Sequence, residues 1–495
     1  SVYHPYPYDN VLTRWGLAES MVNRGTLRID SWGGLTSDKA YFEGHFYSDK
    51  SFLPSALASL SVLPHRMFGA VAGPDTYPIG GAARYIAERL TVSLSLLVLL
   101  VLLKRESGSD DRTSLIPPMA LGLGSILLPY STILYTHVPA ALLIFACYYA
   151  QRRERFAVSD MCGAAAVAFE YTLIVPFLVL LAYRGRRYWT VPRALRALLV
   201  TFLLFLPQLL HNWAAFGSPF SMGYGLEAHG GFPVVSRGFF GFTYPSFSRL
   251  FTILLSPERG ILFYMPWAFL GLWGLFGGRD IRDRLKSDPL PLLVVSYILL
   301  YSAQNAVTAG WAYGQRYLIP ALPFIAIGLG RFASGSKVRS AMAAVSILPG
   351  MLLAFLGVFG EMHLPVHPVS NPLPLPQVNF SLRMLLDGHH SSWLLGAAGA
   401  ALMVACALAL WVLLVRRTGV RVSSFAWLPF WMALAIPSAL EDWGGKPDYY
   451  RGLMAEHRME WELAAGYYES ALLDETAPPA VRERYEYARA RAGAP

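Results

Sequence analysis

Charged residues are scarce in this chain: they make up 15% of its 495 residues, whereas hydrophobic residues make up 54%. Ordinary soluble domains contain about 25% charged residues, and the mean hydropathy here is +0.39. This composition excludes an ordinary soluble enzyme and a disordered chain. The net charge of +9 does not indicate a nucleic-acid partner either, because the basic residues form short clusters between long apolar runs, as in membrane proteins.

Cysteine is nearly absent, and the three present, Cys147, Cys162 and Cys406, all lie within apolar runs. Neither a disulfide framework nor a cysteine-based zinc site is therefore expected, and no metal is predicted. The sequence also opens without an initiator methionine or a signal peptide. We therefore expect that a segment precedes Ser1 in the protein, and this segment adds one more crossing if it contains a helix that brings Ser1 out of the membrane.

Long apolar runs dominate the chain from residue 83 onward. Because about 20 apolar residues cross a bilayer, we interpret the runs as membrane-spanning helices. They lie near residues 83–103, 114–129, 132–150, 160–183, 195–212, 260–277, 289–305, 317–333, 339–358, 392–415 and 423–440. The predicted fold is an all-α polytopic membrane protein with about 12 transmembrane helices.

The run 160–183 is interrupted at its midpoint by Glu170, Tyr171 and Thr172. We interpret it as two short helices with a tight outer turn, because a single crossing would place the next arginine cluster outside, against the positive-inside rule. All the basic clusters then share the cytoplasmic side: Lys104, Arg105 and Arg112; Arg152, Arg153 and Arg155; Arg184, Arg186, Arg187, Arg193 and Arg196; Arg279, Arg282, Arg284 and Lys286; Arg331, Lys337 and Arg339; Arg416, Arg417 and Arg421.

This topology divides the chain into a first outer, periplasmic loop at residues 1–79, a transmembrane core at 80–440 and an outer helical tail at 441–495. In the first loop, residues 10–24 have the spacing of a helix, with Val11, Trp15, Ala18 and Val22 on one face and with Asp9 and Asn10 as candidate N-caps.

Two further segments have an amphipathic pattern. Residues 52–72 are apolar but contain Pro54, Pro64, His65 and Arg66, so we expect them to lie along the membrane interface. The tail has small and aromatic residues at helical spacing. It fits either one tetratricopeptide-like hairpin that binds a protein partner or an ordinary helix pair.

Several motifs resemble, in order, the GT-C superfamily of bacterial membrane glycosyltransferases, the relatives of protein O-mannosyltransferases and of the lipid A aminoarabinose transferase. The likeness covers roughly residues 8–330. It rests on the runs GTLRIDSW…SDKAYFEGHFYSDK, ILLPYSTILYTHVPAA, AAAVAFEYTLIVP, HNWAAFGSPFSMGYG, LLSPERGILFYMPW and GWAYGQRYLIPALP.

The resemblance implies a GT-C-like bundle and a reaction at the outer face. A sugar passes from a polyprenyl-phosphate carrier to a hydroxyl of a glycan, lipid or protein acceptor, and no cofactor is predicted beyond this donor. By family position, Asp9 is the base, while Lys50 and Arg316 contact the lipid phosphate. The chain departs from the family at residues 51–53, where Ser-Phe-Leu replaces the usual small-Pro-Gly triplet.

For each of four other polar residues near the expected outer surface, a role in the site and a purely structural role are both possible. His137 and Arg259 are candidates for binding the donor, and Asp49 and Glu170 are candidates for a supporting role. Equally, His137 and Glu170 suit structural hydrogen bonds, because buried polar groups are normally paired. Asp49 suits an exposed pair with Lys50, and Arg259 suits the positioning of the next helix.

Three functions compete. A lipid-linked-sugar transferase is the leading hypothesis, in a bacterial inner membrane with the active site facing the periplasm. The altered triplet and the extra tail favour the alternative, a non-catalytic GT-C-fold subunit of a membrane complex. A transporter is disfavoured because the predicted helix interiors are almost free of charge. Cytoplasmic nucleotide-sugar chemistry is disfavoured because the inner loops lack a Gly-rich phosphate loop.

Overall fold

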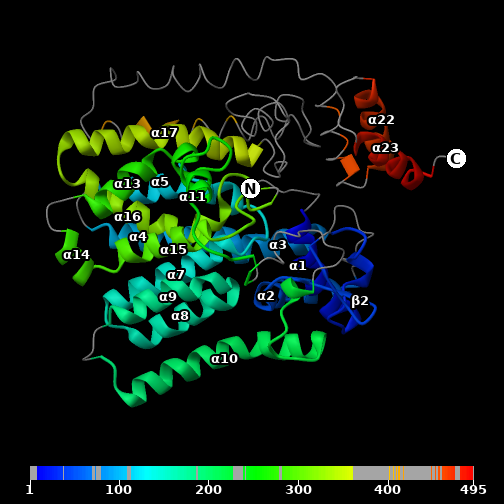
Figure 1. The fold of residues 1–495 in the computed structure, drawn as a ribbon, viewed down its shortest axis with the longest axis horizontal. Coiled ribbons are helices and arrows are strands. Elements are labelled where there is room, and N and C mark those ends of the chain that lie inside the picture. Colours follow the sequence, from blue (N-terminus) through cyan, green and yellow to red (C-terminus); the bar gives the residue numbers. More distant parts are fainter. Residues whose placement is uncertain are drawn as a thin grey trace.

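The computed structural model describes residues 8–36, 38–69, 73, 80–108, 113–184, 188–226, 238–239, 241–277, 281–310 and 312–359, and parts of 401–416 and 448–493. The described chain is almost entirely helical, and most helices run along the long axis of the molecule (Figure 1). This confirms the predicted all-α class. The predicted run 423–440, and most of 392–415, lie outside the described residues.

The N-terminal segment that the sequence analysis assigns to the first loop folds as a small unit at one end of the bundle. Its elements are α1 (Asp9–Glu19), the π-helical turn η1 (Ser20–Arg24), the 3-10 turn η2 (Asp30–Trp32), β1 (Ala40–Phe42), β2 (His45–Tyr47) and α2 (Phe52–Met67). The helix predicted over 10–24 is confirmed, but the predicted caps are wrong. Asp9 is already helical, and Tyr8 is the N-cap residue without a side-chain cap bond.

The two strands form an antiparallel hairpin that the sequence analysis did not predict. Ala40 pairs with Tyr47 and Phe42 with His45, and both turn residues have positive φ, 48° at Glu43 and 86° at Gly44. Two consecutive left-handed residues make the type I′ turn that suits the twist of a tight hairpin. Three-residue strands leave too short an alternating pattern to be recognised from sequence.

The bundle follows from residue 81. Its helices are α3 (Gly81–Glu88), η3 (Arg89–Ser93), α4 (Leu94–Glu106), α5 (Ile116–Gly122), α6 (Leu127–Tyr130), α7 (His137–Arg152), α8 (Phe156–Phe169), η4 (Tyr171–Leu173), α9 (Ile174–Ala182), α10 (Val191–Phe216), η5 (Gly223–Gly225), α11 (Phe247–Leu254), α12 (Ile261–Tyr264), α13 (Trp267–Phe276), α14 (Ile281–Ser287), α15 (Leu290–Ser302), η7 (Arg316–Ala321), α16 (Leu322–Ala333) and α17 (Lys337–Phe359).

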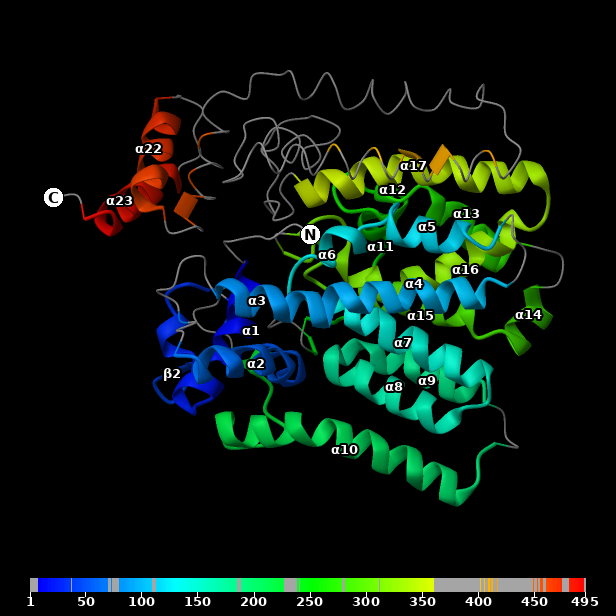
Figure 2. The ribbon, with the colours of Figure 1, turned by 180° about the vertical axis from the view of Figure 1, so that it is seen from behind.

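Four helical stretches of the described chain are long and apolar enough to cross a membrane: Gly81–Glu106, Val191–Phe216, Arg316–Ala333 and Lys337–Phe359. The first two expose most of their apolar side chains, whereas the last two are mostly buried. Figure 2 shows α10 along the outside of the bundle. Exposed leucines on such a helix are expected where the surrounding solvent is lipid.

The predicted hairpin at residues 160–183 is confirmed, since α8 ends at Phe169 and a new helix starts at Tyr171. Two other predicted runs are broken rather than continuous. The run 114–129 splits into α5 and α6, and the run 260–277 splits into α12 and α13. Pro266 explains the second break, because proline cannot donate the backbone bond that would join the two helices.

Glycines allow α13 and α16 to pack closely against each other in the core. A Cβ atom at Gly274 would lie 1.9 Å from the carbonyl oxygen of Gly328, and one at Gly328 would lie 2.2 Å from that of Gly271. Small residues at helix crossings let the backbones touch, which is a main source of attraction between helices in lipid. These positions therefore fix how α13 lies against α16.

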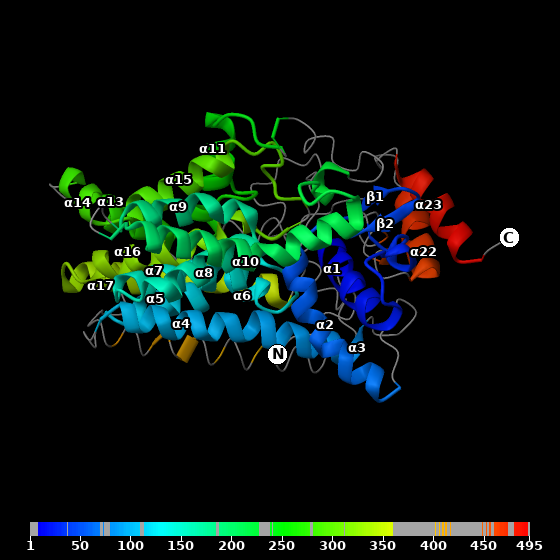
Figure 3. The same cartoon turned by 90° about the horizontal axis from the view of Figure 1, so that it is seen from below.

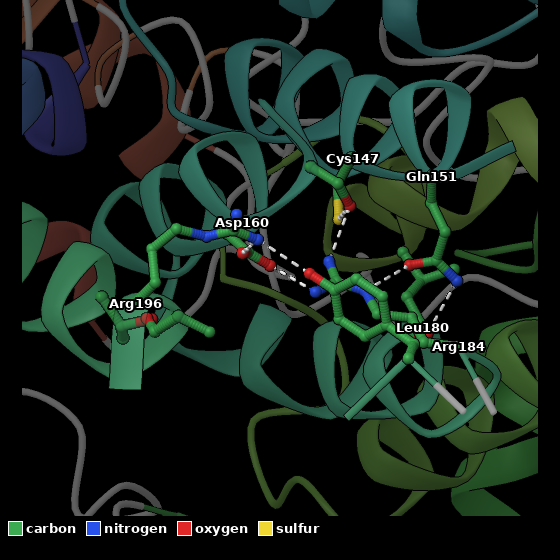
Figure 4. A network of polar contacts seen from close by, with 10 residues as sticks. Cys147, Gln151, Asp160, Leu180, Arg184 and Arg196 are labelled. Atoms are coloured by element: carbon green, nitrogen blue, oxygen red, sulfur yellow. Dashed lines mark hydrogen bonds and ion pairs between the residues drawn. The ribbon is translucent and has the colours of Figure 1, made fainter. Parts of the chain in front are cut away.

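A buried ion-pair network joins α7, α8, α9 and α10 (Figure 4). Arg184 contacts one carboxylate oxygen of Asp160, and Arg196 lies 3.2 Å from the other. Arg184 also donates to Ser159 Oγ at 2.9 Å and to Gln151 Oε1 at 3.1 Å. Asp160 is a buried acid that the sequence analysis overlooked, and its charge is compensated by two arginines.

The two ends of the molecule differ, as Figure 3 shows. One end, here called the hairpin end, carries α1, β1, β2 and the tail helices α22 (Trp461–Leu472) and α23 (Ala480–Arg491); the other carries α14. The tail helices form a pair around Ala464, Tyr468 and Ala471. In α2, the apolar side chains of Leu60 and Met67 are exposed, as an interfacial helix requires.

Candidate functional site

The turn at residues 48–51, between β2 and α2, lies at the centre of the candidate site. Four elements hold it in place through side-chain hydrogen bonds and close contact. From α1, Thr13 Oγ1 donates to Ser48 Oγ at 3.1 Å, and on α8 the Phe169 carbonyl accepts from Ser51 Oγ at 2.9 Å. On α10, Gln208 Oε1 accepts from Phe52 N at 2.7 Å, and Gly223 of η5 lies against the Asp49 backbone. The unusual Ser-Phe-Leu triplet is therefore part of a well-anchored turn.

Lys50 is buried on this turn and lies between two carboxylates. Its Nζ atom is 2.5 Å from Asp49 and 3.1 Å from Asp38, and 5.0 Å from the ring centroid of Tyr224. Although burial disfavours the ammonium form, the carboxylates of Asp38 and Asp49 raise the pKa of Lys50 well above its usual value. Lys50 is thus a fixed cation rather than a proton donor.

Asp49 has an environment that opposes its charge. Burial raises the pKa of Asp49 to about 6, despite the opposing effect of Lys50. Its Oδ1 atom is buried and has no hydrogen-bond partner. A buried polar atom without a partner is costly, so this oxygen is suited to meet a ligand.

Arg14, on the adjacent face of α1, is the second cation of the site. It is buried, its Nε donates to Asn10 Oδ1 at 3.1 Å, and its Nη1 has no hydrogen-bond partner. Burial lowers the pKa of Arg14, whereas Tyr224 and Asp49 oppose this shift. Asp49 and Arg14 therefore each hold one buried polar atom without a hydrogen-bond partner.

Arg316 starts η7, at the hairpin end of the membrane-spanning helix that continues as α16. Its guanidinium carbon lies 5.1 Å from the ring centroid of Tyr135 and 5.5 Å from that of Tyr317. The Tyr317 ring in turn stacks on Tyr301 at 5.0 Å. The Nε of Arg316 is buried without a hydrogen-bond partner. Aromatic faces thus fix this cation while leaving a donor unused.

Tyr135 lies between the Lys50 turn and Arg316. Its hydroxyl lies in the electrostatic field of four side chains: Arg316, Asp38, Asp9 and Lys50. Two direct contacts are established: Arg316 lies over the Tyr135 ring, and Lys50 pairs with Asp38 and Asp49. Asp9, Lys50 and Arg316 therefore lie on three different elements, and the electrostatic influence of all three reaches Tyr135.

Asp9 occupies the first turn of α1, and its main-chain carbonyl accepts a hydrogen bond from Thr36 Oγ1 at 3.0 Å. The same threonine oxygen accepts from Asp38 N at 3.1 Å. Thr36 therefore holds the start of α1 next to the segment that carries Asp38. Asp9 and Asp38 are consequently two carboxylates at the same edge of the site.

His137 and Glu170 form a pair below this edge. His137 Nδ1 lies 3.0 Å from Glu170 Oε1, and the His137 ring stacks on Tyr135 with centroids 5.9 Å apart. Glu170 makes no side-chain cap bond to the helix that follows it, and its Oε2 is buried without a hydrogen-bond partner. The pair ties the tip of the α8–α9 hairpin to the start of α7.

Arg259 contacts the backbone of the loop that precedes Arg316. Its Nη1 donates to the Ala312 carbonyl and its Nη2 to the Gly310 carbonyl, the latter at 3.2 Å. The side chain is fully buried. Arg259 thereby orders the loop that leads into η7, and burial lowers its pKa, opposed chiefly by Tyr264.

Arg14, Tyr135 and Tyr224 are not predicted from the sequence, and Asp38 is assigned no role in the site there. The sequence signal for Arg14 is its spacing, three residues after Val11 and four before Ala18, which places a charge on the apolar face of the predicted helix. No local pattern marks the tyrosines, because only the fold brings them to Lys50 and Arg316. Within the described residues, no group of three His, Cys, Asp or Glu side chains is arranged to hold a metal.

An apolar pocket of about 410 Å³ adjoins the Lys50 turn, between α2 and α10. It is lined by Leu27, Phe52, Leu203, Leu206, Pro207, Leu210 and His211. Phe52 follows Lys50 by two residues, and its ring stacks on that of His211 with centroids 4.9 Å apart. The turn that carries the buried Lys50 thus leads directly into one wall of this apolar pocket, an arrangement that suits an amphiphile with an anionic head.

No family model and no curated protein matches this sequence. Among solved structures, ArnT from Cupriavidus metallidurans bound to undecaprenyl phosphate is similar, with a TM-score of 0.50 and 14% sequence identity over 93% of this chain and 76% of that chain. The apo state of that ArnT gives a TM-score of 0.46 and 14% identity over 84% and 73%. The first likeness confirms the predicted GT-C-like fold.

Proposed function

We propose that the chain is a glycosyltransferase that moves a sugar from a polyprenyl-phosphate-linked donor to an acceptor hydroxyl. The reaction takes place at the hairpin end, which is the outer, periplasmic face of a bacterial inner membrane. The observation that carries this proposal is the buried cation Lys50, which lies two residues before Phe52 in the wall of an apolar pocket. The ArnT of similar fold binds undecaprenyl phosphate, which supports the same class of carrier here.

The residues divide the work by their chemistry. Lys50 and Arg316 hold the phosphate, because charge-assisted bonds to phosphate are short and strong. The unpaired donors Arg14 Nη1 and Arg316 Nε supply further hydrogen bonds to the anionic donor. The carrier chain extends over the apolar surface around Phe52 and Leu203.

Asp9 acts as the general base. It removes the proton of the acceptor hydroxyl while that oxygen attacks the anomeric carbon. The bond from that carbon to the phosphate oxygen breaks, and polyprenyl phosphate leaves with the electron pair. Lys50 and Arg316 stabilise the charge that develops on the phosphate. His137 and Glu170 position Tyr135, on which Arg316 stacks.

A second function is favoured by one specific observation. Lys50 is already flanked by Asp38 and Asp49, so two carboxylates compete with a phosphate for its charge. A non-catalytic subunit that keeps the fold would retain such a closed ion cluster. The tail helices α22 and α23 would then provide the contact with the other subunits of a membrane complex.

Transfer by the reconstituted full chain decides between these functions. Proteoliposomes receive polyprenyl-phosphate donors with different sugars and a membrane extract as acceptor source, and release of polyprenyl phosphate is followed by mass spectrometry. Release that depends on the acceptor, and is lost in Asp9→Asn, supports the transferase. Donor binding without release for every sugar, with the same affinity in Lys50→Ala, contradicts it and favours the subunit.

A further inference from the structure

A second charged cavity lies at the α14 end, remote from the site described above. It has a volume of about 550 Å³ and is lined by Trp273, Gly274, Gly277, Arg284, Asp288, Arg331, Phe332 and Arg339. Figure 1 places α14 at the end of the molecule opposite α1 and β2. No part of the proposed sugar transfer uses these residues.

Two of the three arginines are fixed in place by the protein. Arg284 Nη1 donates to the carbonyls of Leu275 and Gly277, both at 3.0 Å, and so closes the C-terminal end of α13. Arg331 pairs with Asp288, whose other oxygen accepts from Leu290 N at 3.1 Å at the start of α15. Both guanidinium groups are therefore held before any ligand arrives, which reduces the entropy lost on binding.

Arg339 is the available cation of this cavity. It is exposed and lies 5.6 Å over the ring of Phe332, and no ion pair involving it is found in the part of the chain that the structure describes. Three guanidinium groups and one carboxylate leave the lining with a net charge of +2. Planar guanidinium groups suit the oxygens of a phosphodiester.

The surface next to the cavity is apolar. Phe269 and Trp273, one turn apart on α13, are 54% and 56% exposed, and Val338 and Met342 on α17 are 70% and 50% exposed. A small phosphate ester has no apolar part to bury on this surface, whereas the acyl chains of a lipid would cover it. Trp273 belongs to both regions, as expected of a tryptophan at the boundary between lipid and water.

We propose that this cavity binds the phosphodiester headgroup of an anionic glycerophospholipid, with the acyl chains lying on α13 and α17. The lipid comes from the leaflet on the α14 side. Basic pockets between transmembrane helices are suited to such headgroups. The bound lipid bridges α13, α15, α16 and α17, and so stabilises the part of the bundle farthest from the catalytic site.

The test measures lipid binding by the detergent-purified full chain. Native mass spectrometry follows titration with phosphatidylglycerol and, separately, with phosphatidylcholine of the same acyl chains. The variant Arg339→Gln removes the exposed cation, Arg339→Lys keeps the charge without the planar fork, and Lys286→Gln is the matched control. Lys286 lies at the same end, pairs with Asp283 at 2.8 Å and does not line the cavity.

We expect phosphatidylglycerol to be preferred, and Arg339→Gln to weaken its binding about tenfold, as for the loss of one charge-assisted hydrogen bond. Arg339→Lys should recover part of the affinity, and Lys286→Gln should bind as the unmodified chain does. Equal binding of both lipids, or an equal loss in Lys286→Gln, would overturn the proposal. So would displacement of the lipid by an equimolar amount of glycerol 3-phosphate, because the ligand would then be a free phosphate ester.

Discussion

The Nζ atom of Lys50 lies 3.1 Å from a carboxylate oxygen of Asp38, a residue on the other side of the β1–β2 hairpin. The tight turn of this hairpin therefore places an acid from before β1 next to a lysine from after β2. This contact fixes the position of the ammonium group. It also means that a phosphate must share Lys50 with Asp38, so the affinity of the site depends on both carboxylates around the lysine.

Replacement of Lys50 or Arg316 by alanine should weaken binding of polyprenyl phosphate at least tenfold. Each residue is expected to supply a charge-assisted bond that contributes about 1.5–3 kcal/mol. Binding can be measured by microscale thermophoresis in detergent. Arg24→Ala is the control, because Arg24 is an exposed cation of the same loop, paired with Glu19 at 3.6 Å. Unchanged affinity in both site variants would refute their assignment to the phosphate.

Donor binding should become tighter as the pH falls from 7.5 to 5. Burial raises the pKa of Asp49 to about 6, so protonation in this range removes a negative charge beside Lys50 and leaves more positive potential for the phosphate. A gain of about three- to tenfold is expected from one charge at this distance. The probe is a polyprenyl phosphodiester, which does not itself titrate between pH 5 and 8.

The variant Asp49→Asn tests the origin of this pH effect. It should bind tightly throughout the range and show no pH dependence. The same residue affects stability. An unfolded Asp titrates near pH 4, so the folded state binds the proton more tightly, and the stabilisation present below pH 4 is lost as the pH rises through 6. If the melting temperature of Asp49→Asn depends on pH in the same way as that of the unmodified chain, this role of Asp49 is contradicted.

Asp160→Asn should destabilise the fold by about 3–5 kcal/mol, because it removes the acid that compensates the buried Arg184 guanidinium. Arg196→Gln removes the partner at the exposed side of the same network, where the side chain is 40% accessible, and should cost about 1 kcal/mol or less. Urea unfolding in mild detergent measures both. Equal losses in the two variants would show that burial does not set the energy of this network.

Sequence alone predicts the helical class, the 160–183 hairpin and the helix at 10–24, since each leaves a local pattern of apolar spacing or interruption. It predicts neither the β-hairpin nor the break between α5 and α6. The site shows the same limit: Lys50 and Arg316 follow from motifs, whereas Tyr135 and Arg14 gain meaning only from tertiary contacts. Asp160 looks like a stray polar residue in an apolar run until the fold places two arginines beside it.

Cysteine labelling should place the hairpin end and the α14 end on opposite sides of the membrane. In a background without native cysteines, Glu43→Cys in the β-turn and Leu473→Cys in the tail should react with an impermeant maleimide in spheroplasts. Lys286→Cys in α14 should react only after lysis, because basic residues are concentrated at that end. Labelling of Leu473→Cys and Glu43→Cys from different sides would refute a tail on the same side as the site.

Asp9→Asn should slow sugar transfer by about 10²–10⁴ while leaving donor binding intact, because the amide cannot accept the acceptor proton. Asp9 also lies in the first turn of α1, where its negative charge interacts favourably with the helix dipole. The variant should therefore lose about 0.3–1 kcal/mol of stability. A purely structural role predicts this small stability loss with an unchanged rate. Transfer rate and thermal stability, measured on the same preparations, separate these outcomes.

Asp38→Asn is the matched control, because Asp38 is the other carboxylate at this edge and contacts Lys50 directly. Loss of Asp38 frees Lys50 for the phosphate, so this variant should bind the donor more tightly and retain transfer. If instead Asp38→Asn abolishes transfer and Asp9→Asn is fully active, Asp38 is the base. Thr36 bonds to both the Asp9 carbonyl and the Asp38 amide and so links the backbones that carry the two carboxylates. The rates of the two variants therefore decide which carboxylate is the base.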